Sequence, residues 1–228
     1  MTTVAVLTHV DEAVGGLVEE TAREHGHAYR TVRPYRGEAF PALDEIGAVV
    51  ALGGPQAAYE DHPYLAEEER FLRDAVHAGL PVLAICLGSQ VLARALGGCA
   101  RPGEAGLEAG VIRVRSAAPA GTGVEGEYFS FHSDTMTPPP GAEILAESDR
   151  YVQAWTLGTA LAIQFHPEMT LDGVQDLLAV EGPKLERFGV DVAAVRADAE
   201  RYFACGARDS RALLDRWFHD IATARFRH

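Results

Sequence analysis

Basic side chains are scarce in this sequence. There are 20 lysines and arginines against 33 aspartates and glutamates, so the formal net charge is −13. An overall field of this sign repels phosphate backbones and anionic membrane surfaces. We therefore expect no nucleic acid and no membrane among the partners of this protein.

Cysteine is also rare, and Cys86, Cys99 and Cys205 lack the spacing of a disulfide framework. This usage favours a reducing cytosol, so we expect a cytoplasmic protein. The first residues carry no basic region and only a brief apolar run before acidic residues, and we interpret them as a strand rather than a signal peptide. We expect Cys99 and Cys205 to be packing residues.

Phosphate-binding glycine loops of the Walker and dinucleotide types are missing, so we expect neither ATP activation by this chain nor a cofactor. His25 and His27 do not share a helical face, and we expect no metal site there. No linker, repeat or low-complexity tract marks a second domain. We expect one domain over residues 1–228, with a helical tail from about residue 170.

Buried-strand patterns alternate with helical spacing in the first part of the chain. The strand patterns cover residues 4–8, 28–33, 47–52 and 82–85, and the helical patterns cover 12–25, 64–77 and a stretch from about residue 88. Asp11 is the expected N-cap of the first helix, and Glu68 is expected on the solvated face of the second. This alternation predicts a flavodoxin-like, doubly wound α/β fold with a mostly parallel sheet and helices on both faces.

A different pattern follows Gly97 and Gly98. Short strands are predicted at 110–115, 127–131, 144–147, 152–157 and 160–165. They suggest a meander that carries the sheet to an antiparallel edge. The helical tail is predicted to break at Gly182-Pro183, Gly189 and Gly206. Its outer surface could serve a homodimer or simply pack within the chain, and the sequence does not decide between them.

The run PVLAICLGSQVLARALGG, residues 81–98, places Cys86 between a strand and a helix. Ala84 and Gly88 lie two positions to either side, and both are small, as the sharp turn of a nucleophile elbow requires. The amides and dipole at the start of the following helix favour a thiolate. A cysteine after an apolar strand is, taken alone, more often a buried core residue.

His166 ends an apolar strand, and a single proline separates it from Glu168. The two suit a general base and the carboxylate that orients it. Acyl transfer at Cys86 also needs oxyanion donors, and an elbow supplies the amide of the next residue, Leu87. Gly54, in the turn after the third strand, fits the second donor. All five residues are predicted at the carboxyl edge of one sheet.

Three blocks, GGP at 53–55, CLGSQ at 86–90 and QFHPE at 164–168, resemble the signature blocks of class I (triad) glutamine amidotransferases in order and spacing. The resemblance covers nearly the whole chain and is greatest to stand-alone proteins similar to the amidotransferase domain of GMP synthase. It implies that Cys86 is the nucleophile forming a γ-glutamyl thioester, that His166 is acid and base, and that Glu168 orients His166.

The same resemblance implies an oxyanion hole from Gly54 and Leu87. It also implies that Gln90 contacts the amino-acid end of glutamine, together with the segment that holds Phe131, Ser133 and Asp134. Ser133 stands where relatives often have glycine. A side chain there narrows the pocket and bears on strict specificity for glutamine.

Three functions remain open. The first is a glutaminase that hands ammonia to a separate synthetase subunit, and the second is an independent hydrolase or peptidase acting on another γ-glutamyl compound. The third is a catalytically silent regulatory module, which the complete set of Cys86, His166 and Glu168 disfavours.

His9, after the first strand, is expected to line a loop. Trp155, Trp217 and Phe218 are expected in the core or at helix docking contacts rather than in a cofactor site.

Overall fold

The structure, a computed structural model, describes residues 2–11, 15–187 and 189–223. Its helices are α1 (Gly16–Glu24), α2 (Pro63–His77), α3 (Leu87–Ala95), α4 (Leu171–Arg187), α5 (Val192–Ala204) and α6 (Arg208–Ala222), with short 3-10 turns at Pro34–Arg36 and Leu43–Glu45. Its strands are β1 (Thr3–Leu7), β2 (Ala28–Val32), β3 (Ala48–Ala51), β4 (Val82–Ile85), β5 (Cys99–Pro102), β6 (Glu108–Ser116), β7 (Gly126–His132), β8 (Asp134–Thr137), β9 (Glu143–Glu147), β10 (Val152–Leu157) and β11 (Ala160–Ile163).

Within the described residues, nine strands form one mixed sheet in the order β2-β1-β3-β4-β11-β10-β9-β6-β7. The first five of these run parallel to one another. Their order is that of a flavodoxin-like, doubly wound sheet, in which ligands bind at the carboxyl ends of the strands. The predicted fold class is confirmed, and the carboxyl ends of β3, β4 and β11 lead directly to the three sequence blocks.

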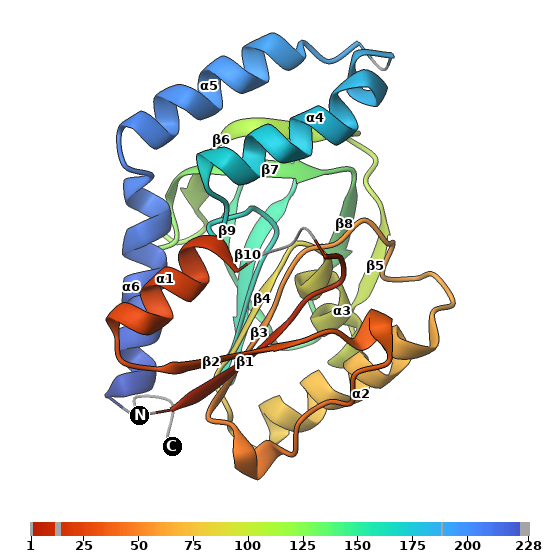
Figure 1. Cartoon of the computed structure of the whole chain (residues 1–228), viewed down its shortest axis with the longest axis vertical. Helices are drawn as coiled ribbons and strands as arrows, with labels where there is room; N and C mark the ends of the chain where they lie inside the picture. The colour runs from red at the N-terminus through yellow and green to blue at the C-terminus, as the bar shows by residue number, and fades with distance from the viewer. Residues whose placement is uncertain (1, 12–14, 188, 224–228) are drawn as a thin grey trace.

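Helices cover both faces of the parallel strands (Figure 1), with α1 and α6 on one face and α2 and α3 on the other. Successive side chains of β1 pack alternately on the two faces of the sheet. Val4 and Val6 belong to the core under α1 and α6, whereas Ala5 and Leu7 belong to the core under α2 and α3. A strand with a core on each face must be apolar throughout, which explains the continuous apolar run at the start of the sequence.

The predicted antiparallel edge is confirmed, but its strands do not all follow in chain order as a meander would. β11 leaves it to become the fifth parallel strand beside β4, with Ala162 opposite Ala84. β6 pairs with both β7 and β9, so β7 lies at the edge. A second, two-stranded sheet of β5 and β8 was not predicted. These pairings join distant segments, and strand patterns do not specify such partners.

The predicted break at Gly182-Pro183 is also wrong, because α4 continues through it to Arg187. Val174, Leu178, Gly182 and Leu185 keep one buried stripe along the helix. This packing outweighs the missing amide donor of proline. The breaks at Gly189 and Gly206 are confirmed, since both glycines have positive φ and separate helices.

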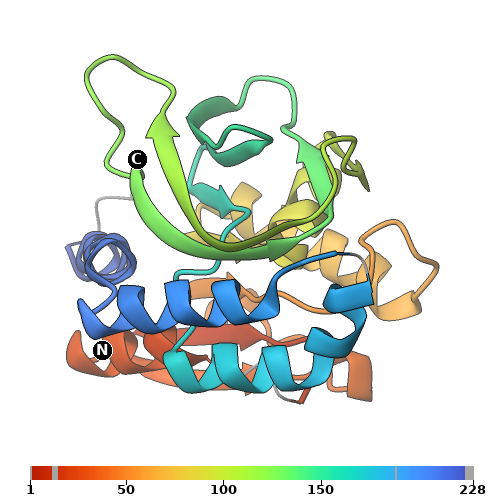
Figure 2. The same ribbon diagram turned by 90° about the horizontal axis from the view of Figure 1, so that it is seen from above.

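The tail packs back on the domain. α5 lies alongside β6 (Figure 2), where Val195 approaches Gly110. α6 contributes Trp217 and Phe218 to the core it shares with β1, and Trp155 is fully buried in the opposite core, as expected. No helix in the described ranges is both long and apolar enough to cross a membrane.

The first helix begins later than predicted, at Gly16, and residues 12–14 of the predicted range lie outside the described residues. Gly15 precedes the helix, and no side chain caps it. The carboxylate of Asp11 instead accepts hydrogen bonds from Tyr35 and Arg36. The expected N-cap at Asp11 is therefore wrong, because Asp11 pairs with the segment after β2.

Candidate active site

Cys86 occupies a sharp turn between β4 and α3. Its backbone φ is 51° and ψ is −110°, and it is one of two non-glycine residues with positive φ in the described part of the chain. Such a conformation costs on the order of 1–3 kcal/mol and persists where the surroundings enforce it. Strand pairing provides that constraint from one side, since the Cys86 amide donates to the Ile163 carbonyl at 2.9 Å.

Close packing explains why Ala84 and Gly88, two positions to either side of Cys86, are small. A Cβ added at Gly88 would lie 2.3 Å from the carbonyl oxygen of Ala51, so only glycine lets α3 approach β3. Ala84 is fully buried between Ala51 and Ala162 in the sheet register. The fit of both residues agrees with a nucleophile elbow, and it holds the cysteine at the start of α3.

His166 follows β11 and lies between Cys86 and Glu168. Its Nδ1 is 2.6 Å from Glu168 Oε1, and its amide donates to the Phe129 carbonyl at 2.8 Å. Burial alone would lower the pKa of His166, but the charges of Glu168 and Cys86 and their hydrogen bonds raise it well above the ordinary histidine value. The site thus favours an imidazolium beside the cysteine sulfur.

The Gly53-Gly54 turn after β3 lies against both of these groups. A Cβ on Gly53 would lie 3.0 Å from His166 Cε1 and 3.4 Å from Cys86 Cβ. A Cβ on Gly54 would lie 2.9 Å from Leu87 Cδ2. The turn and the first residue of α3 therefore meet beside the sulfur, where the two expected oxyanion donors belong.

Gln90 lies one turn into α3 and is buried. Its Nε2 donates to Gln164 Oε1 at 3.3 Å, which links the second and third sequence blocks. The Nε2 of Gln164 is buried with no hydrogen-bond partner among the described residues. An unsatisfied buried donor at this position is suited to a polar ligand.

The expected substrate segment lies at the turn from β7 to β8. Phe131 is half-buried in β7, Ser133 is exposed, and the Ser133 carbonyl accepts from the Gly103 amide at 2.8 Å. Asp134 forms a side-chain hydrogen bond with Tyr59, in the loop after Gly54. Burial and this hydrogen bond raise the pKa of Tyr59. The structure brings this segment to the loop that follows the glycine turn, and the exposed Ser133 side chain places no bulk in the protein interior.

A buried hydrogen-bond network, which was not predicted from the sequence, supports the segment from Phe131 to Asp134. Glu108 accepts hydrogen bonds from His132 at 3.2 Å, Ser148 at 2.8 Å and Gln153 at 2.7 Å. The other ring nitrogen of His132 is 2.8 Å from the Asp134 carbonyl. Burial raises the pKa of Glu108, but these hydrogen bonds outweigh it and the pKa is lowered.

A second histidine and glutamate pair lies behind the glycine turn. His9 and Glu68 are both buried, and Nε2 of His9 is 2.9 Å from Glu68 Oε2. The expectation that Glu68 is solvated is therefore wrong, and His9 does more than line a loop. The missed signal was the position of Glu68 between Leu65 and Leu72 on the apolar face of α2.

Cys99 and Cys205 were expected to pack in the interior, and this is wrong, because both are exposed. Cys86 is the buried one of the three free cysteines. The described residues contain no group of three His, Cys, Asp or Glu side chains placed to hold a metal ion.

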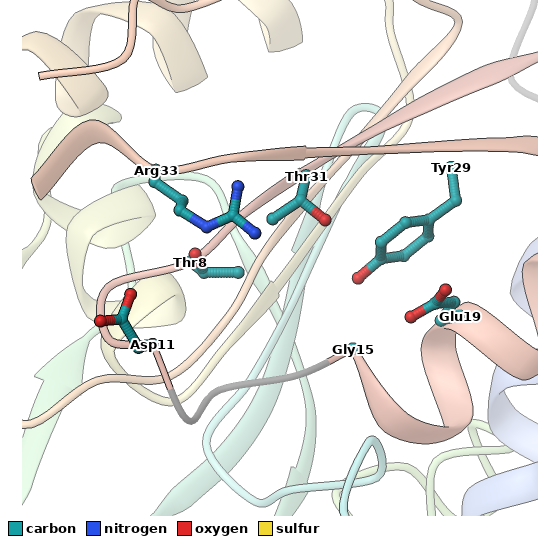
Figure 3. Close-up of a pocket in the computed structure, with 7 residues that line it drawn as sticks. All are labelled: Thr8, Asp11, Gly15, Glu19, Tyr29, Thr31 and Arg33. Atoms are coloured by element: carbon teal, nitrogen blue, oxygen red, sulfur yellow. The ribbon is translucent and has the colours of Figure 1, made fainter. Parts of the chain in front are cut away.

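A separate cavity of about 200 Å³ opens at the ends of β1 and β2 (Figure 3). Its lining residues are Thr8, Asp11, Gly15, Glu19, Tyr29, Thr31 and Arg33. None of them belongs to the group around Cys86. The cavity is lined by one guanidinium, of Arg33, and two carboxylates, of Asp11 and Glu19.

A family model and several known proteins match this chain. A family model for glutamine amidotransferase class-I matches residues 12–178. A GMP synthase (glutamine-hydrolyzing) of Pyrobaculum aerophilum is 31% identical over 157 residues, which are 67% of this chain and 30% of that protein. The chain thus spans about a third of the length of this synthase.

Two further relatives match over most of their length. A glutamine amidotransferase-like protein of Salmonella typhimurium, YfeJ, is 30% identical over 219 residues, with 84% of this chain and 88% of that protein covered. The crystal structure of a glutamine amidotransferase from Thermotoga maritima superimposes with a TM-score of 0.86 at 28% identity, covering 95% of this chain and 98% of that one.

Proposed function

Since the chain belongs to the class I glutamine amidotransferase family, we propose that it hydrolyses the γ-amide of glutamine through a thioester on Cys86 and releases ammonia. The observation that supports this most directly is the placement of His166 between the strained Cys86 and the carboxylate of Glu168. A nucleophile, a base and a group that orients the base are the parts that acyl transfer requires.

In the first half of the proposed reaction, the sulfur of Cys86 attacks the γ-carbonyl carbon of glutamine. The carbonyl π electrons move to oxygen, and the amides of Gly54 and Leu87 stabilise the resulting oxyanion. When the carbonyl re-forms, the carbon–nitrogen bond breaks and the His166 imidazolium gives its proton to the departing nitrogen. The products are ammonia and a γ-glutamyl thioester.

In the second half, His166 takes a proton from a water molecule that attacks the thioester. The carbon–sulfur bond breaks, glutamate leaves, and His166 and Cys86 return to their starting state. Glu168 holds Nδ1 of His166 throughout, so that Nε2 faces the sulfur and the leaving group. Gln90 and the segment with Phe131, Ser133 and Asp134 would hold the amino-acid end of the substrate.

The test is ammonia release from glutamine by the purified chain. We expect Cys86→Ser to abolish turnover and Cys99→Ser, at an exposed cysteine, to leave it unchanged. Intact-protein mass spectrometry of a quenched reaction should show one γ-glutamyl adduct on Cys86. Wild-type protein that releases ammonia from no γ-glutamyl amide, alone or with a synthetase, would favour a silent module and refute the proposal.

We further propose that the ammonia serves a separate synthetase subunit. The matched GMP synthases are about three to four times as long as the matched region, which supports a division of labour between this chain and a partner. A synthetase partner should raise the turnover of glutamine. Faster turnover of γ-glutamyl peptides than of glutamine, without any partner, would instead favour an independent γ-glutamyl hydrolase.

We also propose that residues 1–228 act as one domain in the cytoplasm. The core shared by Val4, Leu17, Leu214 and Phe218 supports the first point, because it joins the first strand to the last helix. The three free cysteines support the second, because a reducing compartment keeps a catalytic thiol active.

A further inference from the structure

The Gly53-Gly54 turn has a buried anchor on the side away from Cys86. Nδ1 of His9 is 3.2 Å from the Gly53 carbonyl oxygen, and Nε2 of the same ring lies 3.1 and 2.9 Å from the two carboxylate oxygens of Glu68. The side chains of His9 and Glu68 are completely shielded from solvent. Neither residue belongs to the three sequence blocks.

The partners of His9 define its protonation. A carbonyl oxygen and a carboxylate only accept hydrogen bonds, so both ring nitrogens must donate. His9 is therefore an imidazolium in this arrangement. Burial lowers the pKa of His9, but the charge of Glu68 and its hydrogen bonds outweigh burial, and the pKa lies above the ordinary value. Tyr64, also on α2, is the other titratable group beside the ring.

The carbonyl that His9 holds shares a peptide unit with the Gly54 amide. In a planar trans peptide, the C=O and the N–H point in opposite directions. A carbonyl directed at His9 on one side therefore directs the Gly54 N–H to the other side, and this N–H donates to no group within the described residues. Gly54 itself is wedged between His9 and Leu87, at 2.5 Å and 2.9 Å from an added Cβ.

We propose that His9 and Glu68 are a positioning pair that fixes the Gly53–Gly54 peptide, so that the Gly54 amide faces the oxyanion formed at Cys86. The imidazolium also polarises this peptide and makes its N–H a stronger donor. The inference rests on the proposed function for the role of Gly54. Neither residue of the pair touches the substrate, so the effect is on the transition state rather than on binding.

Two substitutions at His9 separate the contacts. In His9→Asn the amide nitrogen replaces Nδ1 and still reaches Gly53, whereas in His9→Gln it lies nearer the place of Nε2 and reaches Glu68. We expect His9→Gln to lower kcat for glutamine by about 10- to 100-fold with KM within about 2-fold, since a lost oxyanion donor costs 10²- to 10³-fold. His9→Asn should lose clearly less.

The rate at which iodoacetamide alkylates Cys86 distinguishes a positioning role from a general structural defect. A structural defect would lower this rate together with kcat, whereas loss of the positioning role would lower kcat alone. Displacement of iodide forms no oxyanion, so its rate should stay within about 2-fold of wild type in both variants. His27→Gln is the matched control, because His27 is a buried histidine in the other core beside Phe218. Equal losses in His9→Asn and His9→Gln, parallel losses of kcat and alkylation, or an unchanged kcat would overturn the inference.

A crystal structure of His9→Gln tests the inference without activity. We expect the Gly53–Gly54 peptide to be rotated or to adopt two orientations, and a peptide fixed as in the wild type would refute the positioning role. If wild type turns over no γ-glutamyl amide, the proposed function fails, and this structure still decides whether His9 sets the peptide.

Discussion

The amide of Leu17 donates a hydrogen bond of 2.9 Å to the backbone carbonyl of Glu168. The first turn of α1 thus holds Glu168, whose carboxylate contacts Nδ1 of His166, although the two segments are far apart in the sequence. Gly16 makes this contact possible, because its φ is +47° and an added Cβ would lie 2.2 Å from the Glu168 oxygen. Helix α1 is therefore part of the support of the site.

Gly16→Ala should displace the Glu168 backbone and reduce kcat by about 10- to 100-fold, since small misplacements of catalytic groups have effects of this size. Gly26→Ala is the control, because Gly26 also has positive φ but has nothing within 4 Å of an added Cβ. The control should lose stability through backbone strain of about 1–3 kcal/mol and keep its kcat. Similar kcat values in the two variants would contradict the coupling.

Replacing Glu168 by Gln removes a charge next to His166. The charge of Glu168 raises the pKa of His166 against the effect of burial, so Glu168→Gln should lower that pKa. An NMR titration of the His166 ring in both proteins measures the change. We expect kcat to fall by about 100-fold, within the usual contribution of a general acid and base. An unchanged His166 titration would show that Glu168 does not govern the proton.

The network at Glu108 should matter for substrate binding and for stability in acid. Glu108→Gln weakens the support of His132 and thereby of Asp134, so we expect a higher KM for glutamine with little change in kcat. Glu108→Ala leaves buried donors unpaired and should cost about 1–3 kcal/mol. Kinetics and urea unfolding at neutral pH measure the two effects. A loss of kcat at constant KM would contradict the first.

The pH dependence of this stability has a defined sign. The folded-state pKa of Glu108 is below its usual value of 4.5, so its contribution is present above pH 4.5 and is lost as the pH falls through the lower folded value. The urea midpoints of wild type and Glu108→Gln should therefore approach one another as the pH falls below 4.5. A constant difference would refute this linkage.

The contribution of the His9 and Glu68 pair to the free energy of unfolding should change with pH in the opposite direction to that of Glu108. The folded-state pKa of His9 is raised above 6.5, so its contribution is fully present below pH 6.5 and is lost as the pH rises through the folded value. The free energy of unfolding of wild type and Glu68→Gln should differ most near pH 6 and converge at alkaline pH. His166 titrates in both proteins, so the difference between them isolates the pair. A gap that widens with pH would contradict this assignment.

Local patterns were sufficient for much of the fold and for the strand-to-helix turn at Cys86. The apolar runs around Val4, Val49 and Leu83 predicted strands with a core on each face, and this held because double-sided burial leaves few polar positions. Ala84 and Gly88 identified the elbow, because its turn excludes larger side chains. The positions of β5 and β8 were missed, since a two-stranded ladder depends on a partner distant in the sequence.

By itself the sequence determined the parallel α/β fold and the elbow at Cys86, because periodicity and steric limits at a tight turn are local properties. The tertiary structure alone decided that Glu68 is buried against His9, that Glu108 supports His132, and that α1 holds Glu168. These contacts join residues from separate elements. Whether a glutamate faces water or a histidine depends on which elements the fold brings together.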